Sequence, residues 1–133
     1  MNKVTFKAFK ASEITFVNTL ENGTRVEFDN KYSYNVRFSQ SNTCVGEFTV
    51  DISDKHTPDK FHIKATILGI FSYAEGLKKE VVHVGTYKEL FPYVRAMIQN
   101  LTVNAGLPPI ILPSIDIEAQ SIYKFEKNNN FNI

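Results

Sequence analysis

The first half of the chain is dominated by apolar residues that alternate with polar ones. A period of two is typical of a strand with one buried face. The alternation is most regular over residues 31–39. The segment at 61–73 ends in a run that is apolar on both faces, which favours a central or doubly covered strand. We therefore predict strands over 4–16, 31–39, 47–52 and 61–73.

Polar breaks and turn residues separate these strands. The Ser-Glu pair at 12–13 interrupts the first strand, so we predict a bend or a bulge there. The Asn-Gly dipeptide at 22–23 marks a turn. The polar segment after it carries two isolated apolar residues, Val26 and Phe28, and we expect this segment to lie on the surface. Residues 53–59 close a hairpin.

The second half changes to the spacing of a helix. Residues 86–89 have the form of a capping box, so we predict that a helix begins at Thr86. Pro92 lies too deep for the first turn and should kink or restart this helix, and Gly106 supplies a stop. Its apolar face would consist of Leu90, Val94, Met97, Ile98, Leu101 and Ala105.

Three prolines make residues 107–113 a stiff, extended, apolar connector. A second helix is predicted after a cap at Ser114 or Asp116, with Phe125 near its end. Its apolar face would carry Ile115, Ala119 and Ile122. The fold class is thus α+β, with one domain over residues 1–127 and a flexible, asparagine-rich tail over 128–133.

Composition and charge narrow the function. Apolar residues make up 43% of the chain, but no run approaches the roughly 20 residues that span a bilayer. The N-terminus lacks the apolar stretch of a signal peptide, and the single cysteine, Cys44, cannot form an internal disulfide. We therefore expect a cytoplasmic protein with no membrane insertion. A net charge of +1, spread along the chain, nominates no nucleic-acid partner.

Candidate nucleophiles and metal ligands are few. Cys44 could act as a nucleophile only with His56, His62 or His83 as its base, and no local motif joins them. The histidines lack the spacing of a metal-ligand pair, and the glycines are too dispersed for a phosphate-binding loop. We expect no enzyme activity, no metal and no cofactor.

Aromatic residues are the distinctive bias, with eleven Phe, six Tyr and no Trp. Tyr32, Tyr34, Val36 and Phe38 share one face of the second predicted strand. Two interpretations stay open for this stripe. It is either the core face of a strand, or partly an apolar surface left for a partner, because two short helices cannot cover both faces of a sheet.

The C-terminal part resembles a known family. The Leu-Phe-Pro-Tyr-Val-Arg run at 90–95 is similar to the Leu-Phe-Pro-Tyr-Ala-Arg sequence in the main helix of the SecB protein-export chaperones, and only Val94 departs from it. Gly-Ile-Phe-Ser at 69–72 and the proline-containing segment at 107–116 also resemble this family. The resemblance spans the chain in outline and is specific over about residues 67–120.

The resemblance implies a four-stranded antiparallel sheet with two C-terminal helices on one side, assembled as a dimer of dimers. It also implies ATP-independent binding of unfolded polypeptides or preproteins in hydrophobic grooves, the activity of a holdase. By position in the family, the groove would be bordered by the second strand, the loop before it and the last helix. The projected client contacts are Val26, Phe28, Tyr34, Val36, Phe38, Ile115 and Ile122.

This chain departs from the family pattern in charge. Typical members are acidic, which helps them dock on the SecA motor, whereas this chain is near neutral and ends in lysines and asparagines. Docking on SecA is therefore less expected than client binding. Two alternatives stay open: a SecB-like chaperone dedicated to one partner, such as an antitoxin, and an interaction module that keeps the fold but buries the groove.

Overall fold

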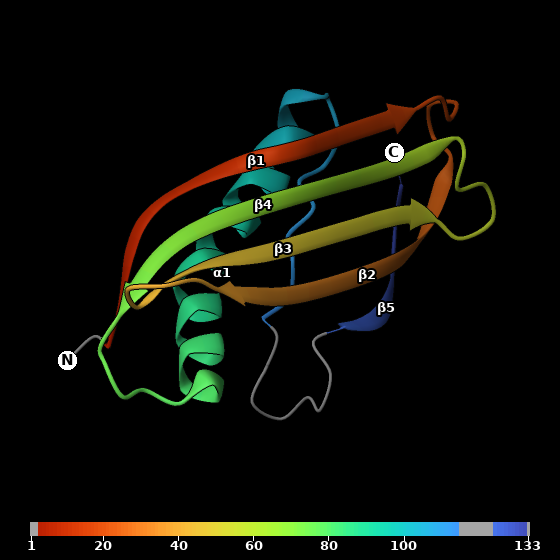
Figure 1. Cartoon of the computed structure of the whole chain (residues 1–133). Helices are drawn as coiled ribbons and strands as arrows, with labels where there is room; N and C mark the ends of the chain where they lie inside the picture. The colour runs from red at the N-terminus through yellow and green to blue at the C-terminus, as the bar shows by residue number, and fades with distance from the viewer. Residues whose placement is uncertain (1–2, 115–123, 133) are drawn as a thin grey trace.

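A computed structural model describes residues 3–114 and 124–132. Its elements are β1 (Val4–Asn18), β2 (Arg25–Phe38), β3 (Thr43–Asp54), β4 (Phe61–Tyr73), α1 (Lys79–Asn104) and β5 (Lys124–Asn132). The strands form one antiparallel sheet in the order β1-β4-β3-β2-β5. Helix α1 crosses one face of this sheet, and no described helix covers the other face (Figure 1).

The predicted α+β fold and its four antiparallel strands are confirmed, and the fifth strand was not predicted. β5 pairs with β2 from Arg25 to Ser33 and includes asparagines for which a flexible tail was expected. Asparagine is a poor strand former, but antiparallel pairing uses backbone groups that nearly every residue has. The strand therefore rests on its pairing with β2 rather than on a pattern that the sequence displays.

The number of helices differs from the prediction. Most of the second predicted helix, at 115–123, falls outside the described residues, and Phe125, expected near its end, belongs to β5. The described part of the chain contains one helix rather than two.

Strand β1 is interrupted twice. Its register with β4 shifts between Phe6 and Ala8 and again between Ala11 and Glu13. The second shift confirms the bulge predicted at 12–13. Each shift adds an unpaired residue to β1, so the alternation of its side chains between the two faces changes phase at that point.

Strand β2 is longer than predicted, because it begins at Arg25. Gly23, with φ of 83°, forms the turn that was expected just before it. The surface position expected for Val26 and Phe28 is wrong: they are 0% and 1% exposed. They belong to the inward face of β2, which α1 and the connector cover. The polar residues that alternate with them, Arg25, Glu27 and Asp29, face outward and gave the segment its polar composition.

Helix α1 begins at Lys79, so the predicted start at Thr86 is wrong. A Thr-x-x-Glu sequence also fits a helix interior, where the threonine hydroxyl can bond a carbonyl of the preceding turn. Thr86 Oγ1 does so, donating to the carbonyl oxygen of His83 over 3.1 Å.

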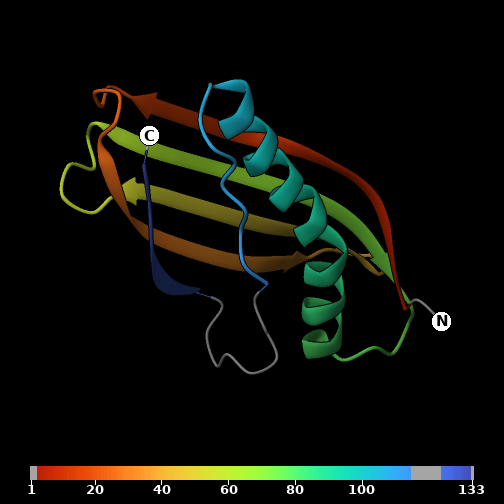
Figure 2. The same ribbon diagram turned by 180° about the vertical axis from the view of Figure 1, so that it is seen from behind.

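The helix continues through Pro92 to Asn104, and Figure 2 shows its axis bending between its two halves, as expected for an internal proline. Gly106 has φ of 84° and ends the helix as predicted. The connector at 107–113 is extended, also as predicted, and runs beside α1 over the same face of the sheet (Figure 2).

The core lies between the sheet and the layer made by α1 and the connector. Strands β1 to β4, helix α1 and the connector contribute inward-facing apolar residues that are nearly inaccessible to solvent. Its large members include Phe28, Tyr34, Phe48, Phe61, Phe71, Leu90, Ile98 and Leu112.

Candidate functional site

Two of the four residues in the stripe that the sequence singled out on β2 are core. Tyr32 and Tyr34 are 2% and 1% exposed, and they continue the inward face begun by Val26 and Phe28. The core interpretation of the stripe therefore holds for its first part in this conformation. Of the projected client contacts, Val26, Phe28 and Tyr34 lie beneath the surface.

Tyr34 is fixed by three sets of contacts. Its hydroxyl donates a hydrogen bond of 2.7 Å to Thr86 Oγ1, and its ring makes edge contacts with His83 and Tyr87 at centroid distances of 5.0 and 5.5 Å. Burial raises the pKa of its phenol well above the ordinary value. On β3 the phenol lies over Gly46, where a Cβ atom would come within 2.9 Å of Tyr34 Cζ.

One polar side chain stands among the inward-facing residues of β2. Asn30 is 1% exposed, and within the described part of the chain its Oδ1 has no hydrogen-bond partner. A buried acceptor without a donor costs free energy, so such groups are uncommon in folded proteins. Burial raises the pKa of the neighbouring Tyr32 to about 12. A hydrogen bond that the Asn30 side chain donates to the phenol, and which does not involve Oδ1, lowers this pKa by less than burial raises it.

The stripe reaches the surface at the end of β2. Val36 and Phe38 are half-buried. The Phe38 ring meets Tyr73 edge-on at 6.0 Å, and Lys79 Nζ lies 5.2 Å from its centroid. These two residues are the projected contacts that solvent reaches. Ile115 and Ile122, the remaining two projected contacts, fall outside the described residues.

A second apolar surface, which the sequence did not single out, lies between β1 and α1. A hollow of about 430 Å³ is lined there by Phe9, Ile14, Tyr93, Ala96, Met97, Asn100, Leu101 and Asn104. The bulges in β1 explain why it was missed. Simple alternation separates Phe9 from Ile14, yet Phe9 pairs with Gly69 and Ile14 with Ala65, positions that share one face of β4.

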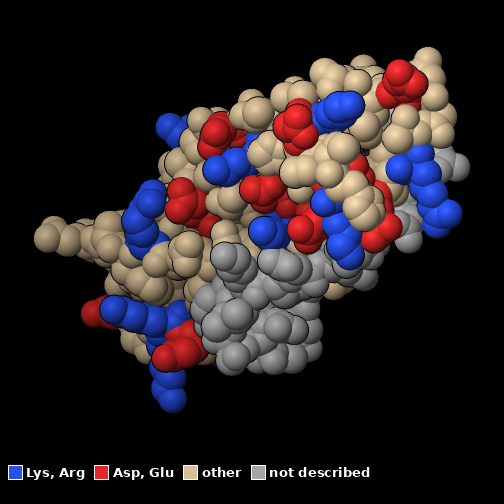
Figure 3. Space-filling model, turned by 90° about the vertical axis from the view of Figure 1, so that its right-hand side faces the viewer, with Lys and Arg blue, Asp and Glu red and all other residues tan. Residues whose placement is uncertain are grey.

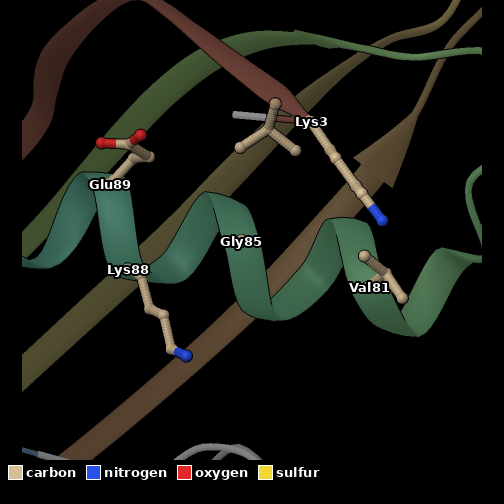
Figure 4. Close-up of a pocket in the computed structure, with 6 residues that line it drawn as sticks. Lys3, Val81, Gly85, Lys88 and Glu89 are labelled. Carbon is tan, nitrogen blue, oxygen red and sulfur yellow. The ribbon is translucent and has the colours of Figure 1, made fainter. Parts of the chain in front are cut away.

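A smaller hollow of about 310 Å³ lies near the start of α1 (Figure 4). Lys3, Val81 and Gly85 line it, and Lys88 and Glu89 leave the helix in opposite directions there. Gly85 lets the helix approach β1, since a Cβ atom would lie 3.3 Å from a methyl group of Val4. The two lysines and the glutamate that line this hollow do not converge on a point where a ligand could be held.

The candidate nucleophile and bases do not form a catalytic group among the described residues. Cys44 is buried, which raises the pKa of its thiol. His62 bonds Asp51 at 2.8 Å, His56 lies 3.6 Å from Glu27, and the half-buried His83 packs against the ring of Tyr34. Residues 3–114 and 124–132 hold no cluster of three possible metal ligands.

Charges of both signs are interspersed on the surface that Figure 3 shows. On the uncovered face of the sheet, Arg37 Nη1 lies 3.7 Å from Glu47 Oε1, and Asp51 bonds His62. Such a surface has no strong field of one sign with which to attract a charged partner.

Within the described ranges, no helix has the length and apolarity needed to cross a membrane.

Comparison with known proteins gives consistent matches. The family model described as preprotein translocase subunit SecB matches residues 44–130. The protein-export protein SecB of Orientia tsutsugamushi (strain Boryong) is 29% identical over 139 residues, which cover 96% of this chain and 86% of that protein.

Two further matches concern an archaeal relative and a solved structure. An uncharacterized protein of Methanocaldococcus jannaschii is 27% identical over 69% of this chain and 61% of its own length, so this chain spans less than two thirds of that relative. The structure is a SecB-like chaperone of Mycobacterium tuberculosis in complex with a ChAD peptide from the HigA1 antitoxin. It matches with a TM-score of 0.65 and 14% identity over 85% of this chain and 91% of its own, a likeness that shows the fold alone.

Proposed function

This chain belongs to the SecB family, and from that premise we propose that it is an ATP-independent holdase, which binds unfolded or non-native polypeptides through apolar surface. A holdase acts by preferential binding to the unfolded state and requires no chemistry. The scattered positions of Cys44 and the histidines fit such a role better than catalysis.

We place client contact on the inward stripe of β2, entered from its exposed end. Val36 and Phe38 are the projected contacts that solvent reaches, and the stripe continues from them to Tyr34, Phe28 and Val26 beneath the covering layer. A client would meet the first two directly and the other three only where that layer moves aside. Each large apolar side chain buried in this way contributes about 1.5–3 kcal/mol.

The observation that carries this placement is Asn30. Its buried Oδ1 lacks a donor within the described residues, on the same face as the projected contacts. A polypeptide backbone offers N–H donors irrespective of its sequence, and a holdase must accept many sequences. Asn30 would accept such a donor from a client, so a position that costs folding stability would contribute to binding.

Oligomerisation belongs to the same proposal. We propose a homo-oligomer in the cytoplasm, a dimer of dimers, in which several weak sites act on one client. Linked sites raise the overall affinity by effective concentration, so no single groove has to bind tightly.

A chaperone dedicated to one partner is the second candidate. It is favoured by the charge pairs on the uncovered face of the sheet, where the acidic Glu47 and Asp51 each lie beside a basic partner, Arg37 and His62. The Mycobacterium tuberculosis structure, bound to an antitoxin peptide, is the precedent within this fold. Delivery of preproteins for export is the alternative use of the same groove.

The experiment is suppression of aggregation of a chemically denatured protein, without ATP. We expect the wild type to suppress aggregation, and the Val36→Asp/Phe38→Asp variant to lose at least half of this effect. Val103→Asp is the matched control, because Val103 is 49% exposed on α1 and away from β2. Equal activity of all three proteins would contradict the placement on β2, and no suppression by the wild type would favour the dedicated chaperone.

A further inference from the structure

One edge of β2 is paired along only part of its length. β5 is the outermost strand on that side of the sheet and pairs with residues 25–33 of β2 (Figure 1). β3 pairs with the other edge as far as Phe38, whereas no described strand pairs with the β5 side at residues 34–38. Unpaired N–H and C=O groups at a sheet edge form a template for another strand. This open stretch contains the solvent-accessible Val36 and Phe38 and continues directly into the stretch that β5 occupies.

β5 is poorly suited to its place by composition. Four of its nine residues are asparagine, a residue that is depleted in strands. Among the described helices and strands it approaches β2 alone, so its departure would break no other strand pair. The pairing that places it there uses backbone groups, which any extended segment without proline also offers. Another strand could therefore take its position.

The inward face of β2 determines which segment would fit this position best. Its residues recur at every second position and, apart from Asn30, they are apolar. β5 has polar residues at two of the matching register positions, with Lys127 opposite Asn30 and Asn129 opposite Phe28. Residues directly opposite one another in a strand pair interact, so a segment that is apolar at each of these positions would pair more favourably than β5.

We propose that β5 is an internal occupant of the client site, and that a client binds by replacing it as the strand next to β2. The client pairs first with the open stretch at residues 34–38 and then extends along β2 as β5 leaves. It follows β2 along its edge, by backbone pairing, rather than over its covered face. The segments selected in this way are extended, free of proline and apolar at every second residue. Strand addition draws affinity from main-chain hydrogen bonds and specificity from alternate side chains.

The inference rests on the proposed holdase and names the class of segment that its site accepts and the way the site is regulated. Because β5 competes with every client, the apparent affinity is reduced by the fraction of molecules in which the edge is occupied. An edge that stayed open would pair with any exposed strand, including one from another copy. A strand of low propensity keeps this edge covered until a better-fitting segment arrives.

Two pairs of substitutions in β5 should change client affinity in opposite directions. Asn128→Pro/Asn129→Pro removes two successive N–H groups, one of which points toward β2 because strand residues alternate between the two edges. Asn128→Thr/Asn130→Thr introduces β-branched residues that favour strands. We expect the proline variant to bind a client about threefold more tightly than the wild type, or better, and the threonine variant to bind it more weakly by a similar factor.

The probe is a labelled peptide as long as β5, in which valine and phenylalanine alternate with lysine and glutamate, and its binding is followed by fluorescence anisotropy. The same peptide with two prolines at its centre should bind more weakly to every protein. Asn104→Thr is the matched control, because Asn104 is exposed at the end of α1, and it should bind like the wild type. Circular dichroism confirms that each variant is folded, and the threonine variant keeps the test open if the proline variant is not.

Hydrogen exchange measures the replacement itself. On binding of the alternating peptide, the amides of β5 should lose protection, while those of residues 25–33 on β2 should keep it. Equal affinity of the wild type and both β5 variants, or a β5 that stays protected in the complex, would overturn the inference and leave the holdase standing. Failure of the wild type to hold any unfolded protein would instead contradict the holdase, and the inference with it.

Discussion

Tyr34 shows how one side chain can hold the covering layer to the sheet. Its hydroxyl bonds Thr86 on α1, and its ring lies on the bare backbone of Gly46 in β3. The phenol end of the tyrosine can approach β3 this closely only because residue 46 has no side chain. This packing position required the structure, since the sequence shows Gly46 only as one more residue of a strand.

Gly46→Ala should therefore destabilise the protein. The new methyl group would overlap Tyr34, and overpacking of this kind costs about 1–3 kcal/mol. Urea unfolding of the wild type and the variant measures the loss. In a Tyr34→Phe background the same substitution should cost less, because the overlapping hydroxyl is absent; an equal cost in both backgrounds would show that Tyr34 is not the obstacle.

Asp54 joins the end of β3 to two other segments. Its carboxylate accepts hydrogen bonds from the Glu27 backbone N–H at 3.2 Å and from the backbone N–H of Thr57 at 3.0 Å, and also from the Thr57 hydroxyl. Burial acts to raise the pKa of Asp54, but the bonds from Thr57 and Glu27, with the nearby His56, outweigh burial and lower it below its ordinary value.

A lowered folded-state pKa has a definite consequence for acid stability. The contribution of Asp54 is fully present above the unfolded pKa, near 4, and is lost as the pH falls through the folded value. Asp54→Asn should lower the free energy of unfolding at pH 7 and reduce its decline between about pH 4.5 and pH 2. Asp59→Asn, exposed in the same loop, is the control; identical pH profiles for the wild type and Asp54→Asn would contradict this role.

At the scale of elements, the connector is tied to the end of α1 by one threonine. Thr102 is buried, and its hydroxyl accepts a hydrogen bond of 3.0 Å from the backbone N–H of Ile110. The Thr102 carbonyl oxygen accepts another of 3.0 Å from the N–H of Leu107. These bonds turn the chain back along the helix, so that Leu107, Ile110 and Leu112 reach the core.

Thr102→Val should loosen this attachment while nearly keeping the volume of the side chain. The N–H of Ile110 would lose its acceptor in a buried position, at a cost of about 1–3 kcal/mol. Thr102→Ser keeps the hydroxyl and should cost less than Thr102→Val. Hydrogen exchange at Ile110 gives the local measurement, and unchanged protection in Thr102→Val would contradict the account.

Four of the strands could be predicted, because most of their residues alternate between apolar and polar and turn residues or polar breaks separate them. The start of β2 could not, since the outward-facing polar residues beside Val26 and Phe28 resemble a surface loop when read alone. The start of α1 was misplaced because Thr-x-x-Glu occurs both at helix ends and inside helices. β5 could not be found from its composition, since its place depends on the partner strand.

At the scale of the whole molecule, two apolar surfaces border the sheet, and only one of them could be recognised in the sequence. One begins at Val36 and Phe38 and leads into the core along β2, and the other lies between β1 and α1 around Phe9 and Ile14. The sequence indicated the first through its aromatic stripe. It gave no sign of the second, because the bulges in β1 change which residues share a face.

As a holdase, the protein must distinguish an unfolded chain from a folded one by binding alone. The most direct measurement is the fluorescence anisotropy of a labelled protein that is reduced and permanently unfolded, titrated with the chain without nucleotide, beside the same labelled protein in its native form. We predict saturable binding of the unfolded form, at least tenfold tighter than any binding of the native form, and weakened by Val36→Asp/Phe38→Asp. Equal affinity for the two forms, or no binding of either, would contradict this role.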